Sequence, residues 1–294
     1  MAYASDTSSI SQSIAMDDTS NGQESQVDWI SHSRNKTELA SNAVGPRPDA
    51  ECYKKHERRG IAIIFNQEKF YSPGCSTRLG TNKDRDDLEE VLNRLKFDVK
   101  VYNDLIYEEI IEVLEVVSKM NHANHDCLLI AVMTHGEDGK LYAKDRPFPT
   151  RKLWTPFSGI HCPSLAGKPK LFFIQACRGD KTDPGVMVNC TETDSSQDEN
   201  VYSIPVTADT LIMYSTVEGY FSWRDPKNGS YFIQSLVRQL KEHHQNRDLL
   251  SILTCVNREV AVGFTSNAPG QPLLNNKKEM CSIVSMLTRR FYFD

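Results

Sequence analysis

A cysteine and a histidine each follow closely on a strongly apolar stretch of the sequence. Cys177 comes directly after KLFFIQA (170–176), and His135 follows CLLIAVM (127–133) after one threonine. A thiol becomes an effective nucleophile when a nearby imidazole takes its proton or stabilises the thiolate. The two residues therefore predict covalent catalysis by a cysteine, provided that the fold brings them together.

Glycines accompany both residues, Gly136 next to the histidine and Gly179 shortly after the cysteine. Glycine lets the backbone of a substrate approach closely. The backbone N–H groups of Gly136 and Cys177 are then expected to hold the oxyanion of an acyl-transfer intermediate. Either residue alone would fit a structural role equally well, because most buried cysteines are chemically inert.

The elements that must position these residues alternate between strand and helix patterns. Strand-like runs cover residues 61–65, 98–102, 127–133, 170–176, 210–215 and 282–293. Apolar residues at helical spacing cover 87–95, 106–120, 232–240 and 249–262. This alternation predicts an α/β fold with a mostly parallel central sheet flanked by helices on both faces, and a ligand site at the carboxyl ends of the strands.

The composition excludes several classes of function. The net charge of −5 gives no overall attraction to nucleic acid or to an anionic membrane. No apolar stretch has the length that a bilayer requires, and the first residues lack a secretory signal pattern. We expect a soluble, cytoplasmic protein with its eight cysteines as thiols, no cofactor and no metal.

Two segments differ from the rest of the chain. Residues 1–49 are rich in serine and poor in aromatic residues, so they predict a disordered leader, or prodomain. Residues at about 183–203 are polar and acidic without periodicity, and predict an exposed, protease-sensitive linker. This linker would divide the folded part into a large piece, 50–194, and a small piece, 195–294.

The stretch QACRG (175–179) fits the pattern of caspases, with a histidine some tens of residues upstream. Further segments resemble caspases in the same order, namely STRLGT (76–81), THGE (134–137), GKPK (167–170) and GYFSWR (219–224). The resemblance covers almost the whole chain beyond the leader. A leader of about fifty residues is too short for the adaptor domain of an initiator, so the chain is most like a short-prodomain executioner caspase.

Caspases are cysteine proteases that cut after aspartate. The resemblance implies Cys177 as the nucleophile and His135 as the catalytic imidazole, oriented by a backbone carbonyl near Ser76. Within this fold, the chain is expected to be cleaved into large and small subunits.

The resemblance also implies how the substrate is held. Arg78, Gln175 and Arg224 match the pocket for the substrate aspartate, and planar cationic donors suit a carboxylate. Phe221 and Trp223, with Ser222 between them, match the adjoining substrate-binding segment.

One position departs from the executioner pattern. Asp225 stands where asparagine is typical, so it is expected to repel an acidic side chain four positions before the cut.

The resemblance also implies that the protein is made as a zymogen, assembles into an oligomer and acts with partner proteins. Cleavage is expected after Asp194 in the linker and after Asp49 or Asp28 in the leader. The mature form would be a homodimer of large/small heterodimers. Expected partners are protein substrates with aspartate before the cut, an upstream initiator caspase and, as candidates, inhibitor-of-apoptosis proteins. Apoptosis is the implied setting, and neither nucleic acid nor membrane is an expected partner.

Other chemistries fit the sequence less well. His122, His125 and Cys127 have the residue types of a zinc site, but no second pair stands at zinc-finger spacing. A phosphatase loop needs an arginine six positions after the cysteine, where Asp183 stands.

The alternative from another class is a catalytically silent, caspase-like decoy that only binds partners. Such a protein has no physical need to keep the two catalytic residues and the three pocket residues, and this sequence keeps all of them.

Overall fold

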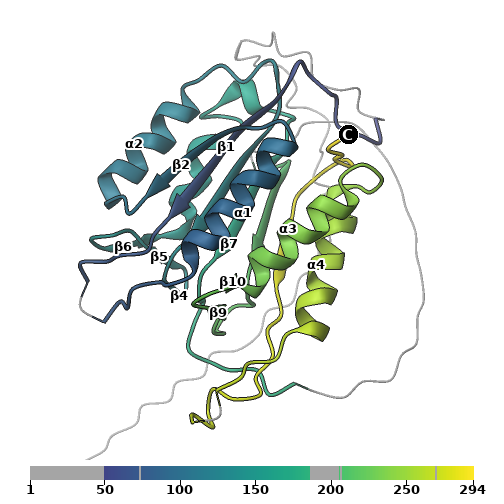
Figure 1. Cartoon of the computed structure of the whole chain (residues 1–294). Helices are drawn as coiled ribbons and strands as arrows, with labels where there is room; N and C mark the ends of the chain where they lie inside the picture. Colours follow the sequence, from purple (N-terminus) through teal and green to yellow (C-terminus); the bar gives the residue numbers. More distant parts are fainter. Residues whose placement is uncertain (1–49, 73, 186–204, 206, 269) are drawn as a thin grey trace, which may run out of the picture. The chain divides into compact units, whose positions relative to one another are not determined.

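The structure is a computed structural model. It describes residues 50–72, 74–185, 205, 207–268 and 270–294. At its centre is a six-stranded sheet with the strand order β11-β8-β7-β3-β1-β2 (Figure 1). These strands are β1 (Arg58–Asn66), β2 (Asp98–Asn103), β3 (His125–Met133), β7 (Lys170–Gln175), β8 (Thr210–Tyr214) and β11 (Ser282–Ser285). All neighbours pair in parallel except β11, which is antiparallel to β8.

The inner strands are apolar throughout because both faces of the sheet are covered. Along β1, Ala62 and Ile64 pack into the core on one face, whereas Ile61 and Ile63 pack into the core on the other. A strand buried on both sides has no reason to alternate between apolar and polar residues. The continuous apolar runs in the sequence therefore correspond to real central strands.

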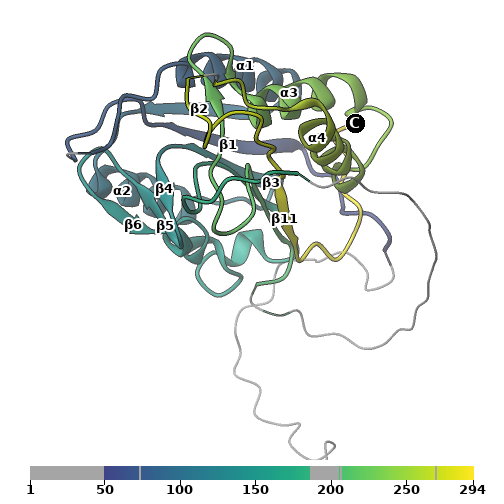
Figure 2. The same cartoon turned by 90° about the horizontal axis from the view of Figure 1, so that it is seen from below.

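Helices lie on both faces of the sheet, as Figures 1 and 2 show. One face carries α1 (Thr81–Arg94), α3 (Tyr231–His243) and α4 (Leu249–Gly263), and the other carries α2 (Tyr107–Ser118). Three short 3-10 turns join α2 on its side, at η1 (Thr150–Leu153), η2 (Thr155–Phe157) and η3 (Pro163–Leu165). The predicted fold class is confirmed.

Two small sheets occur in the connections that follow the strands. One consists of β4 (Gly136–Glu137), β5 (Lys140–Tyr142) and β6 (Pro147–Pro149), and begins directly after His135. The other consists of β9 (Arg224–Asp225) and β10 (Gly229–Ser230) and precedes α3. Both belong to the segments expected to carry the site.

Helix α1 begins at Thr81, six residues before the predicted start at 87. Its first turn is polar but buried: Asp84 is fully buried and accepts hydrogen bonds from the backbone N–H of Ser230 at 2.9 Å. Apolar periodicity cannot detect a helical turn that is buried through polar contacts.

The last strand is shorter than the predicted 282–293. After β11, Met286 still exchanges backbone hydrogen bonds with Asp209 and Thr210 at 2.8 Å. Further on, Arg290 pairs instead with the backbone around Glu51, its N–H donating to the Glu51 carbonyl at 2.8 Å. The chain changes partner, so the strand ends.

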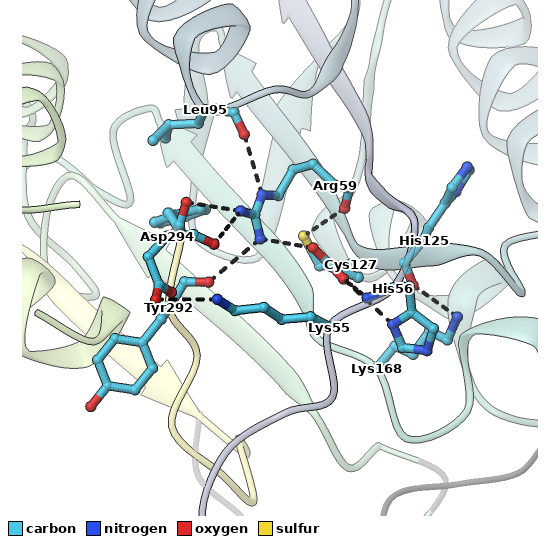
Figure 3. A network of polar contacts seen from close by, with 11 residues as sticks. Lys55, His56, Arg59, Leu95, His125, Cys127, Lys168, Tyr292 and Asp294 are labelled. Atoms are coloured by element: carbon cyan, nitrogen blue, oxygen red, sulfur yellow. Dashed lines mark hydrogen bonds and ion pairs between the residues drawn. The ribbon is translucent and has the colours of Figure 1, made fainter. Parts of the chain in front are cut away.

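A buried arginine ties three parts of the fold together (Figure 3). Arg59, at the start of β1, pairs with Asp126 at 2.8 Å and donates to the carbonyl oxygen of Leu95 at 3.2 Å. It also donates to the carbonyl oxygen of Phe293 at 2.8 Å. The last residues of the chain are thereby attached to β1, β3 and the end of α1.

The leader, most of the predicted linker and the three predicted cleavage sites, Asp28, Asp49 and Asp194, lie outside the described residues. Within the described part of the chain, no helix is both long enough and apolar enough to cross a bilayer.

Candidate active site

The strands that lead to His135 and Cys177 are neighbours in the sheet. β3 and β7 run in parallel with Met133 opposite Gln175, and the N–H of Thr134 donates to the Gln175 carbonyl at 3.0 Å. The histidine and the cysteine each follow two residues after this pair. The adjacency that the catalytic hypothesis requires is therefore present.

Gly136 brings the two loops into direct contact. A β-carbon at this position would lie 2.4 Å from the carbonyl oxygen of Cys177 and 3.0 Å from the β-carbon of Ala176. Only glycine fits without a shift of the backbone. The backbones of Gly136 and Cys177 are therefore side by side, which the predicted oxyanion hole needs.

His135 is held by the main chain. Its Nε2 lies 2.7 Å from the carbonyl oxygen of Ser76, and its ring packs against Phe70 with 4.8 Å between ring centroids. A carbonyl only accepts hydrogen bonds, so Nε2 carries the proton and Nδ1 has a free lone pair. Burial lowers the pKa of His135, and the charges of Arg78 and Arg224 lower it further. The imidazole is therefore neutral at pH 7 and able to accept a proton.

Cys177 is held against the segment that follows β8. The backbone N–H of Ser222 donates to Sγ at 3.5 Å, and Sγ lies 3.8 Å from the Ser222 carbonyl oxygen. Burial raises the pKa of the thiol, although this N–H and the charges of Arg78 and Arg224 act in the opposite direction. The thiol is protonated at pH 7, so thiol and imidazole form a neutral pair.

Arg78 is a buried cation. Its side chain is 1% exposed, and Nη1 donates to the Thr81 hydroxyl at 2.8 Å and to the Gln67 carbonyl at 3.1 Å. Burial lowers its pKa to about 9, and the charge of Arg224 is the second cause. A nearby anion would therefore stabilise the protonated form of this guanidinium group.

Arg224 is the second cation of the pocket. Its Nε donates to the Leu79 carbonyl at 2.8 Å, and burial lowers its pKa. The charge of Asp84 favours the protonated form of Arg224 and of Arg78. Burial raises the pKa of Asp84 itself to about 6. Because this value is still below 7, the carboxylate is mainly ionised at pH 7. The single negative charge of Asp84 offsets at most one of the two guanidinium charges, which leaves positive charge for a ligand.

Gln175 contacts the segment 221–224, which is predicted to bind substrate. Its Nε2 donates to the hydroxyl of Ser222 at 2.8 Å, and this hydroxyl lies 2.8 Å from the hydroxyl of Ser215. The predicted pocket residue therefore also positions Ser222, which is itself buried.

Aromatic rings line the segment beside the cationic pocket. Phe221 packs against Trp223 with ring centroids 5.1 Å apart, and Trp223 packs against Phe264 at 6.0 Å. Trp223, Phe264 and Tyr231 line a cavity of about 590 Å³, whose edge includes Asp225. Arg224 and Arg238 also line this cavity, so it combines aromatic rings with charged groups of both signs.

The residues around the site that sequence reasoning missed are Asp84, Phe264 and Glu279. The available signal for Asp84 was its place in the chain, three residues after STRLGT, the segment that contains Arg78. Phe264 and Glu279 belong to the segment after α4, which carried no recognised motif. By contrast Arg178, next to the cysteine, lies over the ring of Tyr214 at 4.0 Å.

The residues considered for zinc are engaged with one another and with the backbone. Nδ1 of His122 lies 3.1 Å from Nδ1 of His125, and Nε2 of His122 lies 2.8 Å from the Val117 carbonyl. Cys127 Sγ lies 3.5 Å from the Arg59 carbonyl. In the described residues, no group of three or more His, Cys, Asp or Glu side chains is arranged to hold a metal.

The arrangement suits acyl transfer on a substrate that carries a carboxylate. A thiol and a neutral imidazole lie at the ends of adjacent strands, and two backbone loops meet beside the thiol. The charges of the buried Arg78 and the half-buried Arg224 act on both groups.

Comparison with known proteins gives a consistent result. A family model described as the caspase domain matches residues 59–292. The chain is 45% identical over 251 residues to caspase drICE of Drosophila melanogaster, covering 85% of this chain and 74% of that protein. It is 41% identical over 247 residues to caspase-3 of Bos taurus, covering 83% and 88%. The crystal structure of caspase-1 from Spodoptera frugiperda matches with a TM-score of 0.78 and 46% identity, covering 83% of this chain and 94% of that one.

Proposed function

This chain belongs to the caspase family, and from that premise we propose that it is an executioner-type cysteine endopeptidase that cuts proteins after aspartate in apoptosis. In this proposal Cys177 is the nucleophile and His135 is its base. The observation that carries the proposal is that the thiol and the imidazole follow the carboxyl ends of the adjacent strands β7 and β3, with the buried Arg78 and the half-buried Arg224 near enough for their charges to act on both groups.

Catalysis begins from the neutral pair. His135 takes the thiol proton at Nδ1 as Sγ attacks the backbone carbonyl carbon of the substrate aspartate. The carbonyl oxygen then becomes the oxyanion of a tetrahedral intermediate. The N–H groups of Gly136 and Cys177 donate to this oxyanion. The imidazolium returns its proton to the leaving amine, and water then hydrolyses the thioester with His135 as base again.

The attack requires the thiol to leave its resting contacts. The Ser222 N–H donates to Sγ, and the Ser222 carbonyl lies near it. A substrate backbone lying along residues 222–224 can use these groups instead, in the manner of an added strand. Substrate binding would then free the thiol for His135.

Selectivity for aspartate follows from the charge balance of the pocket. Arg78 and Arg224 repel each other, and both are desolvated, so their two positive charges destabilise the empty pocket. A substrate carboxylate offsets this destabilisation when it binds between them. An uncharged side chain of the same size offers no such relief. Gln175 supports the pocket by holding Ser222.

Activation would proceed by cleavage after Asp194 between the large (50–194) and small (195–294) subunits, with leader removal after Asp49 or Asp28. The parts flanking this linker are integrated into one sheet, because β7 before it pairs in parallel with β8 after it. The contacts of Arg59 with the end of the chain add a second attachment (Figure 3). Cleavage would therefore leave the two subunits associated.

Assembly would use the open edge of the sheet. β11 is one of the two edge strands of the central sheet, and its Val284 is 44% exposed. Exposed edge strands favour pairing with another chain. Two copies joined along β11 would give a homodimer of large/small heterodimers.

The expected partners are protein substrates with aspartate before the cut, an upstream initiator caspase that activates the zymogen, and inhibitor-of-apoptosis proteins. The expected location is the cytoplasm. These assignments rest on family membership.

The decisive experiment compares wild type with Cys177→Ala and His135→Ala on fluorogenic peptides that end in Asp, Asn or Glu. We expect wild type alone to cut, only after Asp, and to process itself at Asp194. Mass spectrometry of the products identifies the processing site. If wild type stays inert even after the linker is cut with an engineered protease site, the decoy alternative holds.

A further inference from the structure

A carboxyl group is buried directly beneath the substrate-binding segment. Glu279 is 1% exposed and lies three residues before β11. Its Oε1 accepts a hydrogen bond from the backbone N–H of Trp223 at 3.1 Å and lies 2.8 Å from the Ser222 hydroxyl. Its Oε2 is buried without a hydrogen-bond partner in the part of the chain that the structure describes.

Through Ser222 this carboxyl group is connected to the catalytic loop. The Ser222 hydroxyl also contacts Gln175 and Ser215, and the Ser215 hydroxyl contacts the backbone N–H and carbonyl of Ala176 at 3.3 and 3.2 Å. The backbone N–H of Ser222 reaches Cys177 Sγ. A single buried network therefore extends from Glu279 to the residue before the nucleophile.

The cations on the segments around Glu279 contact groups other than its carboxyl group. On its own segment, Lys278 Nζ contacts the carbonyls of Val262 and Phe264. On the substrate-binding segment, Arg224 Nε contacts the Leu79 carbonyl, and on the catalytic loop Arg178 pairs with Glu218 at 3.2 Å.

The titratable groups whose charge is coupled to Glu279 are thiols. Its negative charge raises the pKa of Cys177 and of Cys281. A buried carboxylate with no cation and one unpaired oxygen is costly, whereas a neutral carboxyl group is much less so.

We propose that Glu279 is a positioning residue that holds residues 222–223 for substrate in its neutral form, and that its ionisation weakens the enzyme at alkaline pH. The proposal rests on the function proposed above. Two consequences of ionisation act together: negative charge near Cys177 makes its thiolate harder to form, and an unpaired buried charge loosens the segment that receives the substrate. Burial, which raises the pKa of Glu279 to about 8, supports this proposal.

The test compares Glu279→Gln, which keeps an acceptor but cannot ionise, with Glu279→Leu, which keeps the size but has no acceptor. Glu115→Gln, on the exposed side of α2, is the matched control. kcat and KM are measured with an Asp-ending peptide from pH 6 to pH 10. We expect Glu279→Leu to lose at least tenfold in kcat/KM at pH 7, and Glu279→Gln to recover most of that loss.

The pH profile separates positioning from simple stability. For each protein, kcat/KM at high pH is divided by its own value at pH 7. Above pH 8 this ratio should be at least fivefold lower for wild type and for Glu115→Gln than for Glu279→Gln. Superimposable profiles for wild type and Glu279→Gln would overturn the proposal, as would full activity of Glu279→Leu.

Two further measurements do not depend on peptidase activity. The first is the rate at which iodoacetamide alkylates Cys177, monitored by mass spectrometry of the peptide that contains this residue. As the pH rises, this rate should reach its plateau at a lower pH in Glu279→Gln than in wild type. The second is thermal unfolding. Because the folded state raises the pKa of Glu279 from 4.5 to about 8, wild type should lose stability relative to Glu279→Gln as the pH rises from about 4.5 to about 8, and the difference should stay constant above pH 8. If wild type cuts no peptide but these two differences appear, the proposed function fails while the ionisation of Glu279 stands. If neither difference appears, the inference about Glu279 is wrong.

Discussion

Nε2 of His135 lies 2.7 Å from the carbonyl oxygen of Ser76, so the imidazole is oriented by the main chain. This contact fixes the proton on Nε2 and leaves Nδ1 free to act as the base in the proposed mechanism. In that proposal the third member of the site is a backbone group, which no side-chain substitution removes directly.

The acid limb of the pH profile should therefore lie below pH 6.5. Burial and two arginines lower the pKa of His135, so the imidazole stays neutral, and the enzyme active, until the pH falls below the ordinary histidine value. The measurement is kcat/KM from pH 4.5 to pH 8. Ser76→Ala should leave the profile unchanged within about twofold, because the carbonyl remains. An acid limb centred above pH 6.5 would contradict the neutral-pair mechanism.

Arg78→Gln should lower kcat/KM for Asp-ending peptides by roughly a hundredfold, because hydrogen bonds to a charged group contribute about 1.5–3 kcal/mol. The loss for Asn-ending peptides should be much smaller, since no carboxylate is present. Arg78→Lys is the control that keeps the charge but not the planar donor pair, and it should fall in between. Equal losses on both peptide series would show that Arg78 acts only structurally.

Gly136→Ala should reduce kcat by at least tenfold while the protein stays folded. The added β-carbon would lie 2.4 Å from the Cys177 carbonyl, so the His135 and Cys177 loops must move apart. Gly270→Ala is the matched control, because a β-carbon there meets no atom within 4 Å. Circular dichroism and active-site titration, beside steady-state kinetics, distinguish misplacement from unfolding. Normal kcat in Gly136→Ala would remove the argument for close contact.

Asp225→Asn should increase kcat/KM for peptides with Asp four positions before the cut, relative to peptides with Val there. The exposed carboxylate of Asp225 accepts hydrogen bonds from the N–H groups of Lys227 and Asn228 at 2.9 and 2.7 Å, which lower its pKa and keep it ionised. Asparagine preserves an acceptor for this turn and removes the charge. The ratio of the two peptides, measured for wild type and variant, is the readout. An unchanged ratio would show that Asp225 does not influence this position.

The proposed catalytic pair and the two arginines proposed to hold the substrate aspartate could be named from the sequence because each belongs to a recognisable local pattern. Cys177 and His135 follow buried parallel strands, where α/β folds place their ligand sites, and Arg78 and Arg224 belong to recognisable short segments. The strands themselves were visible for a related reason: burial on both faces forces continuous apolar composition.

Polar burial was invisible in the sequence. The start of α1 at Thr81 precedes the apolar periodicity at 87–95 because its first turn is packed through Asp84 rather than through apolar residues. Glu279 was missed for the same reason, since a glutamate in a loop gives no sign that the fold will bury it.

The sequence by itself determined the order of the main elements and the fold class, and it named the candidate reactive side chains, because these depend on local composition and spacing. Only the tertiary structure decided which groups those side chains meet: Ser222 against the thiol, Ser76 against the imidazole, and Glu279 beneath the substrate-binding segment. These contacts join segments far apart in the chain. Their energies come from burial and hydrogen-bond geometry, which exist only once the segments have packed.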